Sequence, residues 1–179
     1  MYDILVLAQG MYDKDRILPL PSRVRTMAAI KWIHDNNVAD KSVIYFTAYK
    51  PPSYPKTEPA LAEVMRDFVK EIYTGKVVAL TAPCNFTTKG EVSKFLEVST
   101  ERPVIVSGSY HLLRIFFYLW EARGLSYARR AVYVTATRDK INWRQWLSEL
   151  VKILVILLPE FLQAKLEYWY AKRTHKLTF

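Results

Sequence analysis

The sequence predicts an α/β protein: a three-layer, Rossmann-like fold with a mainly parallel five-stranded sheet and a helical C-terminal extension. Two observations support this prediction. Apolar runs of strand length alternate with segments of helix length, which is typical of a parallel sheet with helices on both faces. The run at residues 103–107 is apolar almost throughout, as expected for a strand that is buried on both faces.

Five segments have the composition of strands, and the segments between them have the period of helices. The strands are predicted at residues 3–8, 42–48, 77–80, 103–107 and 131–135. The helices are predicted at residues 23–36, 58–73, 88–99 and 110–123. In each helix, large apolar residues recur every three or four positions, so that one face can pack against the sheet.

The character of the chain changes near residue 141, which divides an α/β domain (residues 1–140) from a helical extension (residues 141–179). Its first helix carries Trp143, Trp146, Leu147, Leu150, Val151, Leu154 and Val155, and a second helix is expected after Pro159, with Phe161, Leu162, Leu166, Tyr168 and Trp169. We expect Trp143, Trp146 and Leu150 to pack on the domain, because a large apolar face needs cover. A contact with a membrane surface or with a second copy of the chain is the alternative.

Length and composition limit the class of protein. The chain has 179 residues, of which 51% are hydrophobic and 14% aromatic, so it can bury a full core and is not a disordered protein. Cys84 is its single cysteine, which excludes an internal disulfide and favours a packed thiol in a reducing, cytoplasmic setting. We expect no signal peptide, and the apolar run at residues 153–158 is too short to span a bilayer.

The charge balance is strongly basic. Lys and Arg number 26 against 17 Asp and Glu, for a net charge of +9, which indicates an anionic partner. The basic residues are scattered, and the only adjacent pairs are Arg129–Arg130 and Lys172–Arg173. This pattern favours an anionic small molecule over specific nucleic-acid recognition, and it leaves peripheral membrane contact and the oligomeric state open.

A strand followed by a histidine and an arginine is the most informative local feature. The predicted strand at residues 103–107 ends in small polar residues, and His111 and Arg114 follow in the first turn of the next helix. Open α/β sheets bind ligands outside the carboxyl ends of their strands. Both side chains would lie beside free backbone amides and the positive end of the helix dipole. The pattern predicts an anion site, with a solvated surface pair as the alternative.

Five short motifs, each at a strand end or a helix start, occur in an order that is typical of one family. They are a strand with a glycine-bearing loop at residues 3–10, Arg25, the segment at residues 56–66, the segment at residues 85–91, and the segment at residues 106–114. Over about residues 3–136 the chain resembles the YdcF/SanA/ElyC-like family, a bacterial domain of unknown function. The last segment, Val-Ser-Gly-Ser-Tyr-His-Leu-Leu-Arg, resembles the most specific motif of that family.

The chain departs from the family pattern in two loops. The first loop has Ala-Gln-Gly in place of a glycine triplet, and the second strand ends in Thr-Ala-Tyr in place of Ser-Gly-Gly. A proline-rich insertion follows the second strand and displaces the glutamate that opens the next helix of the family. Glu58 and Glu63 are both candidates for that glutamate.

The resemblance implies a Rossmann-like fold with a polar pocket at the carboxyl edge of the sheet. It implies His111, Glu91 and Ser107 as candidates for catalytic roles, and the ligand-binding residues Gly10, Arg25, Glu58, Thr88, Tyr110 and Arg114. One member of the family is reported to bind S-adenosylmethionine, so that molecule is an expected ligand. Other members are linked to the integrity of the cell envelope.

The residue types fit the recognition of an anion. Two arginines and two helix N-termini suit a phosphate or a carboxylate, and a histidine beside carboxylates can transfer protons near neutral pH. NAD is disfavoured because the first loop lacks the Gly-x-Gly-x-x-Gly pattern, and a metal is disfavoured because His34 and His175 lie outside the motifs. We expect an anionic or nucleotide-like ligand, with hydrolysis or group transfer as the reaction; the alternative is a non-catalytic binding protein with an envelope-related role.

Overall fold

The computed structural model describes residues 1–10, 12, 16–48, 50, 57–82, 87–99, 102–136, 143–159, 162, 165 and 166. The chain divides into two compact units, Met1–Asp139 and Lys140–Phe179. The first unit contains the sheet and all of the predicted site residues. In the second unit, one helix, α6 (Trp143–Ile156), is described.

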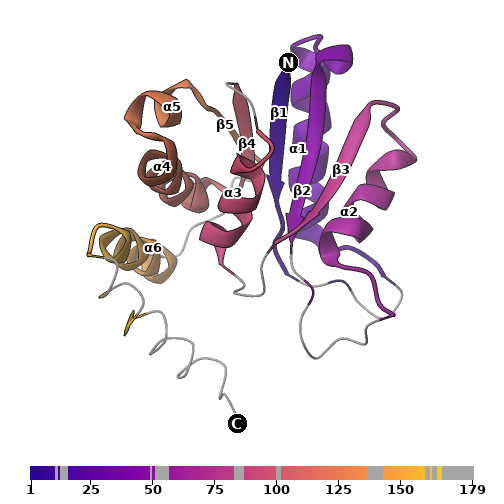
Figure 1. Ribbon diagram of the computed structural model, residues 1–179. Helices are drawn as coiled ribbons and strands as arrows, with labels where there is room; N and C mark the ends of the chain where they lie inside the picture. The colour runs from indigo at the N-terminus through magenta and orange to yellow at the C-terminus, as the bar shows by residue number, and fades with distance from the viewer. Residues whose placement is uncertain are drawn as a thin grey trace. The chain divides into compact units, whose positions relative to one another are not determined.

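The first unit is built on one sheet of five parallel strands (Figure 1). The strands are β1 (Tyr2–Leu7), β2 (Ser42–Ala48), β3 (Lys76–Thr81), β4 (Pro103–Ser107) and β5 (Val132–Thr135). Their order in the sheet is β3-β2-β1-β4-β5, and every neighbouring pair is parallel. The predicted fold class is therefore confirmed, and the predicted strand boundaries agree with the observed ones to within one residue at each end.

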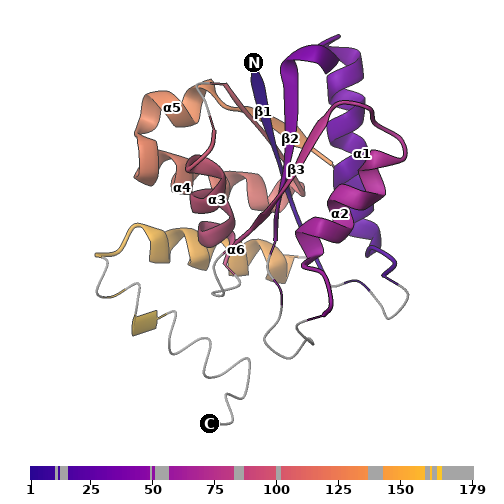
Figure 2. The same cartoon turned by 45° about the vertical axis from the view of Figure 1, so that its right-hand side comes forward.

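Helices cover both faces of the sheet. One face carries α1 (Leu20–Asp35) and α2 (Leu61–Lys70), and the other carries α3 (Thr88–Leu96), α4 (Ser109–Arg123) and α5 (Leu125–Arg130) (Figure 2). Side chains alternate along β1, so that Ile4 and Val6 join the first core and Leu5 and Leu7 join the second. The sheet has two apolar faces, and helices must cover each of them, so two cores form.

Local chemistry explains where α1 and α2 differ from their predicted limits. Helix α1 begins at Leu20, earlier than predicted, because a proline follows in its first turn, where a missing N–H costs nothing. Helix α2 begins only at Leu61, since the residue before it is extended and the Glu63 carboxylate accepts the backbone N–H of Ala60 at 2.6 Å. A short 3₁₀ turn (Ala39–Lys41) leads into β2.

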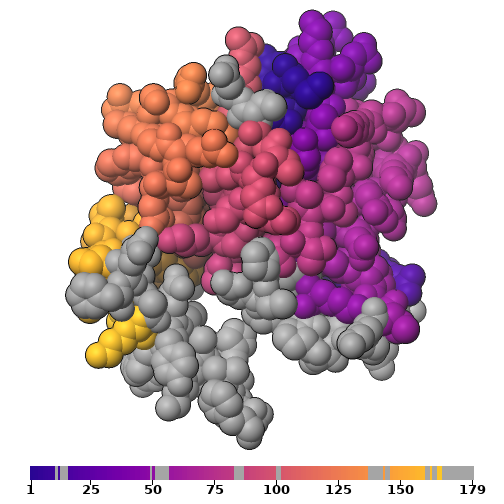
Figure 3. Space-filling model, viewed as in Figure 1, coloured from indigo at the N-terminus to yellow at the C-terminus, as the bar shows by residue number. Residues whose placement is uncertain are grey.

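Helix α5 was not predicted. Helix α4 ends at Gly124, whose φ of +85° is readily adopted only by glycine, and the chain resumes a helix at once. Tyr127 and Ala128 of this short helix then join the second core. Figure 3 shows this face of the first unit, with α3 between the α4–α5 pair and the edge that carries α2.

The order of the strands creates a switch point between β1 and β4. The chain leaves β1 for α1 on one face of the sheet, and it leaves β4 for α4 on the other face. In open α/β sheets a crevice forms at such a point, outside the carboxyl ends of the two strands. The fold therefore specifies where a ligand site is expected before any side chain is considered.

The second unit contains the helix that the sequence predicts from Trp143 onward. The predicted helix after Pro159 falls largely outside the described residues. Along the described part of the chain, no helix combines the length and the apolar character that crossing a bilayer requires. The packing of Trp143, Trp146 and Leu150 on the α/β domain stays a prediction.

Candidate functional site

A cavity of about 210 Å³ lies at the switch point of the sheet. Described residues from five segments of the chain line it: Leu7, Ala8, Gln9, Gly10, Arg25, Leu61, Thr88, Glu91, Ser107 and His111. Six of the nine predicted site residues are in this set. The other three are Tyr110 and Arg114, which contact lining residues, and Glu58, which lies elsewhere.

Arg25 anchors the end of β1 beside the cavity. Its side chain is buried, with 1% of the residue exposed. Nη1 donates to the carbonyl oxygens of Leu7 at 3.1 Å and Ala8 at 3.2 Å, and Nη2 donates to the side-chain oxygen of Gln9. Because the guanidinium is always protonated, these contacts fix a permanent positive charge at the wall of the cavity.

Gln9 is a site residue that the sequence does not predict as one, although it departs from the glycine of the family pattern. Its backbone N–H donates to the Ser22 hydroxyl at 2.9 Å, and its side-chain amide donates to the Tyr110 hydroxyl at 2.8 Å. Gln9 thus connects Arg25 to α4, which a glycine at this position could not do. Its place directly after the first strand was the available signal.

Gly10 follows in the lining of the cavity with a φ of +83°. A Cβ atom added there would lie 3.2 Å from the Pro19 ring, so both the backbone conformation and the space favour glycine.

Arg114 holds His111 and Thr88 from behind the cavity. Its Nη2 lies 2.7 Å from Nδ1 of His111 and donates to the Thr88 hydroxyl at 3.1 Å, and 8% of the residue is exposed. A guanidinium only donates, so Nδ1 of His111 must accept this bond. The ring then carries its proton on Nε2, and His111 acts as a neutral donor.

Tyr110 supports the same arrangement without lining the cavity. Its ring packs against the ring of His111 with centroids 3.9 Å apart, and its hydroxyl accepts the bond from Gln9. In the structure it supports the orientation of His111, and its predicted role as a ligand-binding residue stays a prediction.

Glu91 lies in the first turn of α3, whose N-terminus is capped by the Thr87 hydroxyl through a bond from the Gly90 N–H at 3.0 Å. Burial of the carboxyl raises its pKa to about 8, and Arg25, the backbone N–H of Ala8 and Arg114 offset this only in part. At neutral pH the carboxyl is therefore mostly protonated and can donate a hydrogen bond.

Ser107 ends β4 at the wall of the cavity. The residue is fully buried, and its hydroxyl has no hydrogen-bond partner among the described residues. Buried hydroxyl groups are nearly always paired, because an unpaired one loses its bonds to water without replacement. Such a group in a cavity wall makes Ser107 a candidate for contact with a ligand.

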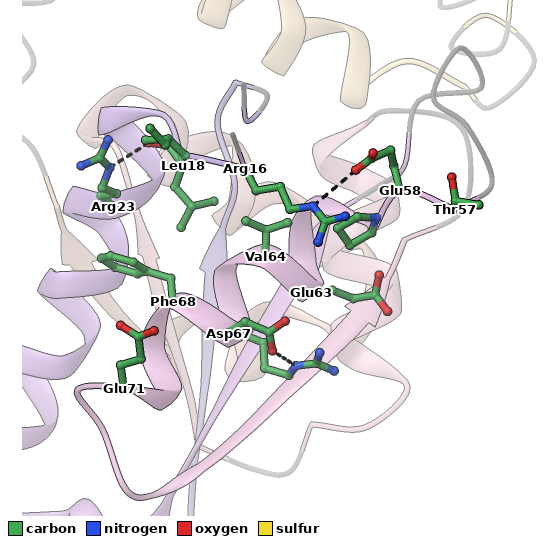
Figure 4. Close-up of a pocket in the computed structure, with 13 residues that line it drawn as sticks. Arg16, Leu18, Arg23, Thr57, Glu58, Glu63, Val64, Asp67, Phe68 and Glu71 are labelled. Carbon is green, nitrogen blue, oxygen red and sulfur yellow. Dashed lines mark hydrogen bonds and ion pairs between the residues drawn. The ribbon is translucent and has the colours of Figure 1, made fainter. Parts of the chain in front are cut away.

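Glu58 does not reach the cavity. It lines a wider groove of about 770 Å³ along α2, where its carboxylate pairs with Arg16 at 3.5 Å (Figure 4). Glu63, the alternative candidate, lines the same groove and caps α2. The physical reason is the late start of α2, which places Leu61, and neither glutamate, at the cavity.

The volume of the cavity is that of a small-anion site. S-adenosylmethionine is a drug-sized ligand, and sites for such ligands occupy about 300–1,000 Å³. The part of the cavity that the described residues line measures about 210 Å³, and binding of S-adenosylmethionine stays a prediction. Within the described ranges, no three or more His, Cys, Asp or Glu residues gather in a way that could hold a metal ion.

Comparison with known proteins gives no relative. No family model matches the chain, and no match is found among curated proteins or solved structures. The resemblance to the YdcF-like family is therefore a proposal that rests on the five motifs. The fold and the cavity rest on the geometry of this chain alone.

Proposed function

We propose that this YdcF-like protein binds a small anion of the phosphate class, as the free ion or as the phosphoryl group of a small ester, in the switch-point cavity. The observation that carries the proposal is Ser107, a fully buried hydroxyl in the cavity wall without a partner among the described residues. An anion oxygen is the acceptor that would complete its hydrogen bonding.

The charges around the cavity support an anion. Arg25 lies in the wall and Arg114 directly behind it, and both are almost fully buried. Positive charge that is withdrawn from water acts more strongly on a ligand than exposed charge does. With Glu91 mostly protonated, no described carboxylate in the wall cancels this charge near neutral pH.

Two helices add to the same effect. Thr88 and Glu91 stand in the first turn of α3, and His111 stands in the first turn of α4. Both helices exceed two turns, and their first turns have free backbone amides and the positive end of the dipole. Phosphate groups are commonly bound at such helix ends.

Binding of inorganic phosphate by the purified protein tests the proposal. We expect calorimetry to give one site per chain, and we expect Ser107→Ala to weaken it while the far-UV circular dichroism stays unchanged. Arg23→Ala is the matched control, because Arg23 lines the wider groove and donates to the Leu18 carbonyl. If the protein binds phosphate at no pH between about 6 and 9, the proposal is refuted.

A second candidate function is hydrolysis of a phosphate monoester, and Glu91 is the observation that favours it. A carboxyl with a pKa of about 8 can protonate the leaving oxygen while water attacks phosphorus. Turnover of p-nitrophenyl phosphate that falls in Glu91→Gln, with phosphate binding retained, would support this candidate. Binding without turnover of any monoester would leave the protein as a non-catalytic binder.

A further inference from the structure

Glu91 differs in kind from every other described side chain in the wall of the cavity. Arg25 can only donate hydrogen bonds, His111 carries its remaining proton on Nε2, and Ser107 and Thr88 bear hydroxyls. Glu91 is the one carboxyl among the described lining residues, and ionisation turns it from a donor into a negatively charged group that can only accept.

We infer that the protonation state of Glu91 controls which oxyanions bind in the cavity. When Glu91 is protonated, any tetrahedral oxyanion can bind there. When Glu91 is ionised, only an oxyanion that carries a proton of its own can bind. The inference rests on the proposed anion site and adds a rule of selection to it. This rule distinguishes between ligands that have the same shape and the same charge.

The chemistry of sulfate and phosphate makes the rule concrete. Above about pH 8 both ions carry two negative charges, but phosphate keeps one P–OH group and sulfate has no proton. A protonated Glu91 can donate to an oxygen of either ion. An ionised Glu91 can accept a bond from the P–OH group, whereas it faces only oxygen lone pairs on sulfate and repels them.

The surroundings of Glu91 allow it to change state within an accessible pH range. Among the described residues, the charged and titratable groups beside it are Arg25 from α1, and His111 and Arg114 from α4. Arginine keeps its charge throughout, and the bond from Arg114 requires an unprotonated Nδ1 on His111. On α3 itself, Lys89 is engaged by Glu121 at 3.0 Å. Burial raises the pKa of Glu91 to about 8.

Calorimetric titration of the whole protein with phosphate and with sulfate, at about pH 7 and about pH 9.5, tests the inference. We expect the two ions to bind similarly at the lower pH. At the higher pH, the preference for phosphate should rise by about tenfold or more, the usual effect of replacing one charge-assisted hydrogen bond by repulsion. Glu91→Gln should show a much smaller change of preference between the two pH values, because an amide does not ionise and only phosphate itself titrates there.

Two further measurements separate the explanations. Glu58→Gln, which removes a carboxylate from the wider groove, should follow the wild-type protein. The variant Glu91→Gln also reports the effect of the second ionisation of phosphate itself, since only the ligand titrates there. A preference that changes equally in the wild-type protein and in Glu91→Gln overturns the role of Glu91 but leaves the anion site intact. Failure of both ions to bind at both pH values overturns the anion site itself.

Discussion

The cavity at the switch point is smaller than the groove along α2, but its side chains are of the kinds better suited to bind a ligand. The groove along α2 measures about 770 Å³, and the cavity at the switch point about 210 Å³. In the groove, Arg16 pairs with Glu58 and Arg66 pairs with Asp67, and these side chains are between 31% and 59% exposed (Figure 4). In the cavity, Arg25 and Ser107 are almost fully buried, and Thr88, Glu91 and His111 are half-buried.

This difference shows that volume alone is a poor guide to function. Exposed charges that already pair with one another gain little from a ligand, because water screens them and each has a partner. Buried donors such as Arg25 and Ser107 cannot turn to water, so they interact strongly with a ligand that enters the cavity. The contrast can be tested by making the same chemical change in both hollows.

The largest expected effect concerns the buried arginine. Arg25→Met removes three hydrogen bonds to residues 7–9, the first of them fully buried. We expect the free energy of unfolding, from urea titration, to fall by about 3 kcal/mol or more. Arg66→Met in the groove breaks only the exposed pair with Asp67 and should cost less than about 1 kcal/mol. Equal losses in the two variants would remove the distinction between the hollows.

The pH dependence of stability is the next largest effect. The pKa of Glu91 is about 8 in the folded protein and near 4.5 when the chain is unfolded. Below the unfolded value the group is protonated in both states and has no effect. As the pH rises from about 4.5 to about 8, only the unfolded carboxyl ionises, so the folded state loses stability relative to it, up to a few kcal/mol.

Comparison of variants isolates this contribution. The free energy of unfolding of Glu91→Gln minus that of the wild-type protein should grow between about pH 5 and about pH 8 and then level off. Glu58→Gln, in the groove, should give a difference that stays nearly flat across the same range. A flat difference for Glu91→Gln as well would show that the Glu91 carboxyl ionises normally in the folded state.

An intermediate effect is expected on ligand affinity. Arg114→Ala removes the donor that holds His111 and Thr88, together with a buried positive charge behind the cavity. Loss of one such charge-assisted contact costs about 1.5–3 kcal/mol, so we expect phosphate affinity to fall roughly tenfold to a hundredfold. Arg23→Ala should leave the affinity unchanged, and a similar loss there would point to long-range charge and not to the cavity.

The sequence was sufficient to predict the sheet because its signal is local. Apolar runs such as residues 103–107 specify a buried strand wherever they occur, and the alternation with helices specifies the parallel order. Gly10, Ser107 and His111 could be placed in one region on topology, since each follows a strand or opens a helix.

What could not be predicted depends on contacts between distant segments. Gln9 accepts a bond from Arg25 and donates one to Tyr110, 101 positions further along the chain, and no local pattern shows such a bond. The start of α2 was also misjudged, because the Glu63 cap and the extended backbone before Leu61 moved Glu58 into the groove. The unusual state of Glu91 arises from burial, which the sequence alone does not give.

The smallest expected effect also gives the most direct comparison, because it concerns two buried hydroxyls that both lack a described hydrogen-bond partner. Ser107 ends β4 and Thr47 lies near the end of β2, both are fully buried, and neither hydroxyl has a partner among the described residues. Ser107 lines the cavity, and Thr47 is not among the described lining residues of either hollow. Removal of an unpaired buried hydroxyl relieves a desolvation cost, so Ser107→Ala and Thr47→Val should each raise the free energy of unfolding by about 1 kcal/mol.

The free energies of unfolding of the two variants should differ only when phosphate is present. Ser107→Ala should weaken phosphate binding by about threefold to tenfold, the usual worth of one neutral hydrogen bond, and Thr47→Val should leave it unchanged. Urea titration with and without phosphate measures both quantities in one experiment, since a ligand adds stability in proportion to its affinity. If Ser107→Ala instead lowers stability without phosphate, its hydroxyl serves the fold, and the strongest argument for a ligand in this cavity is lost.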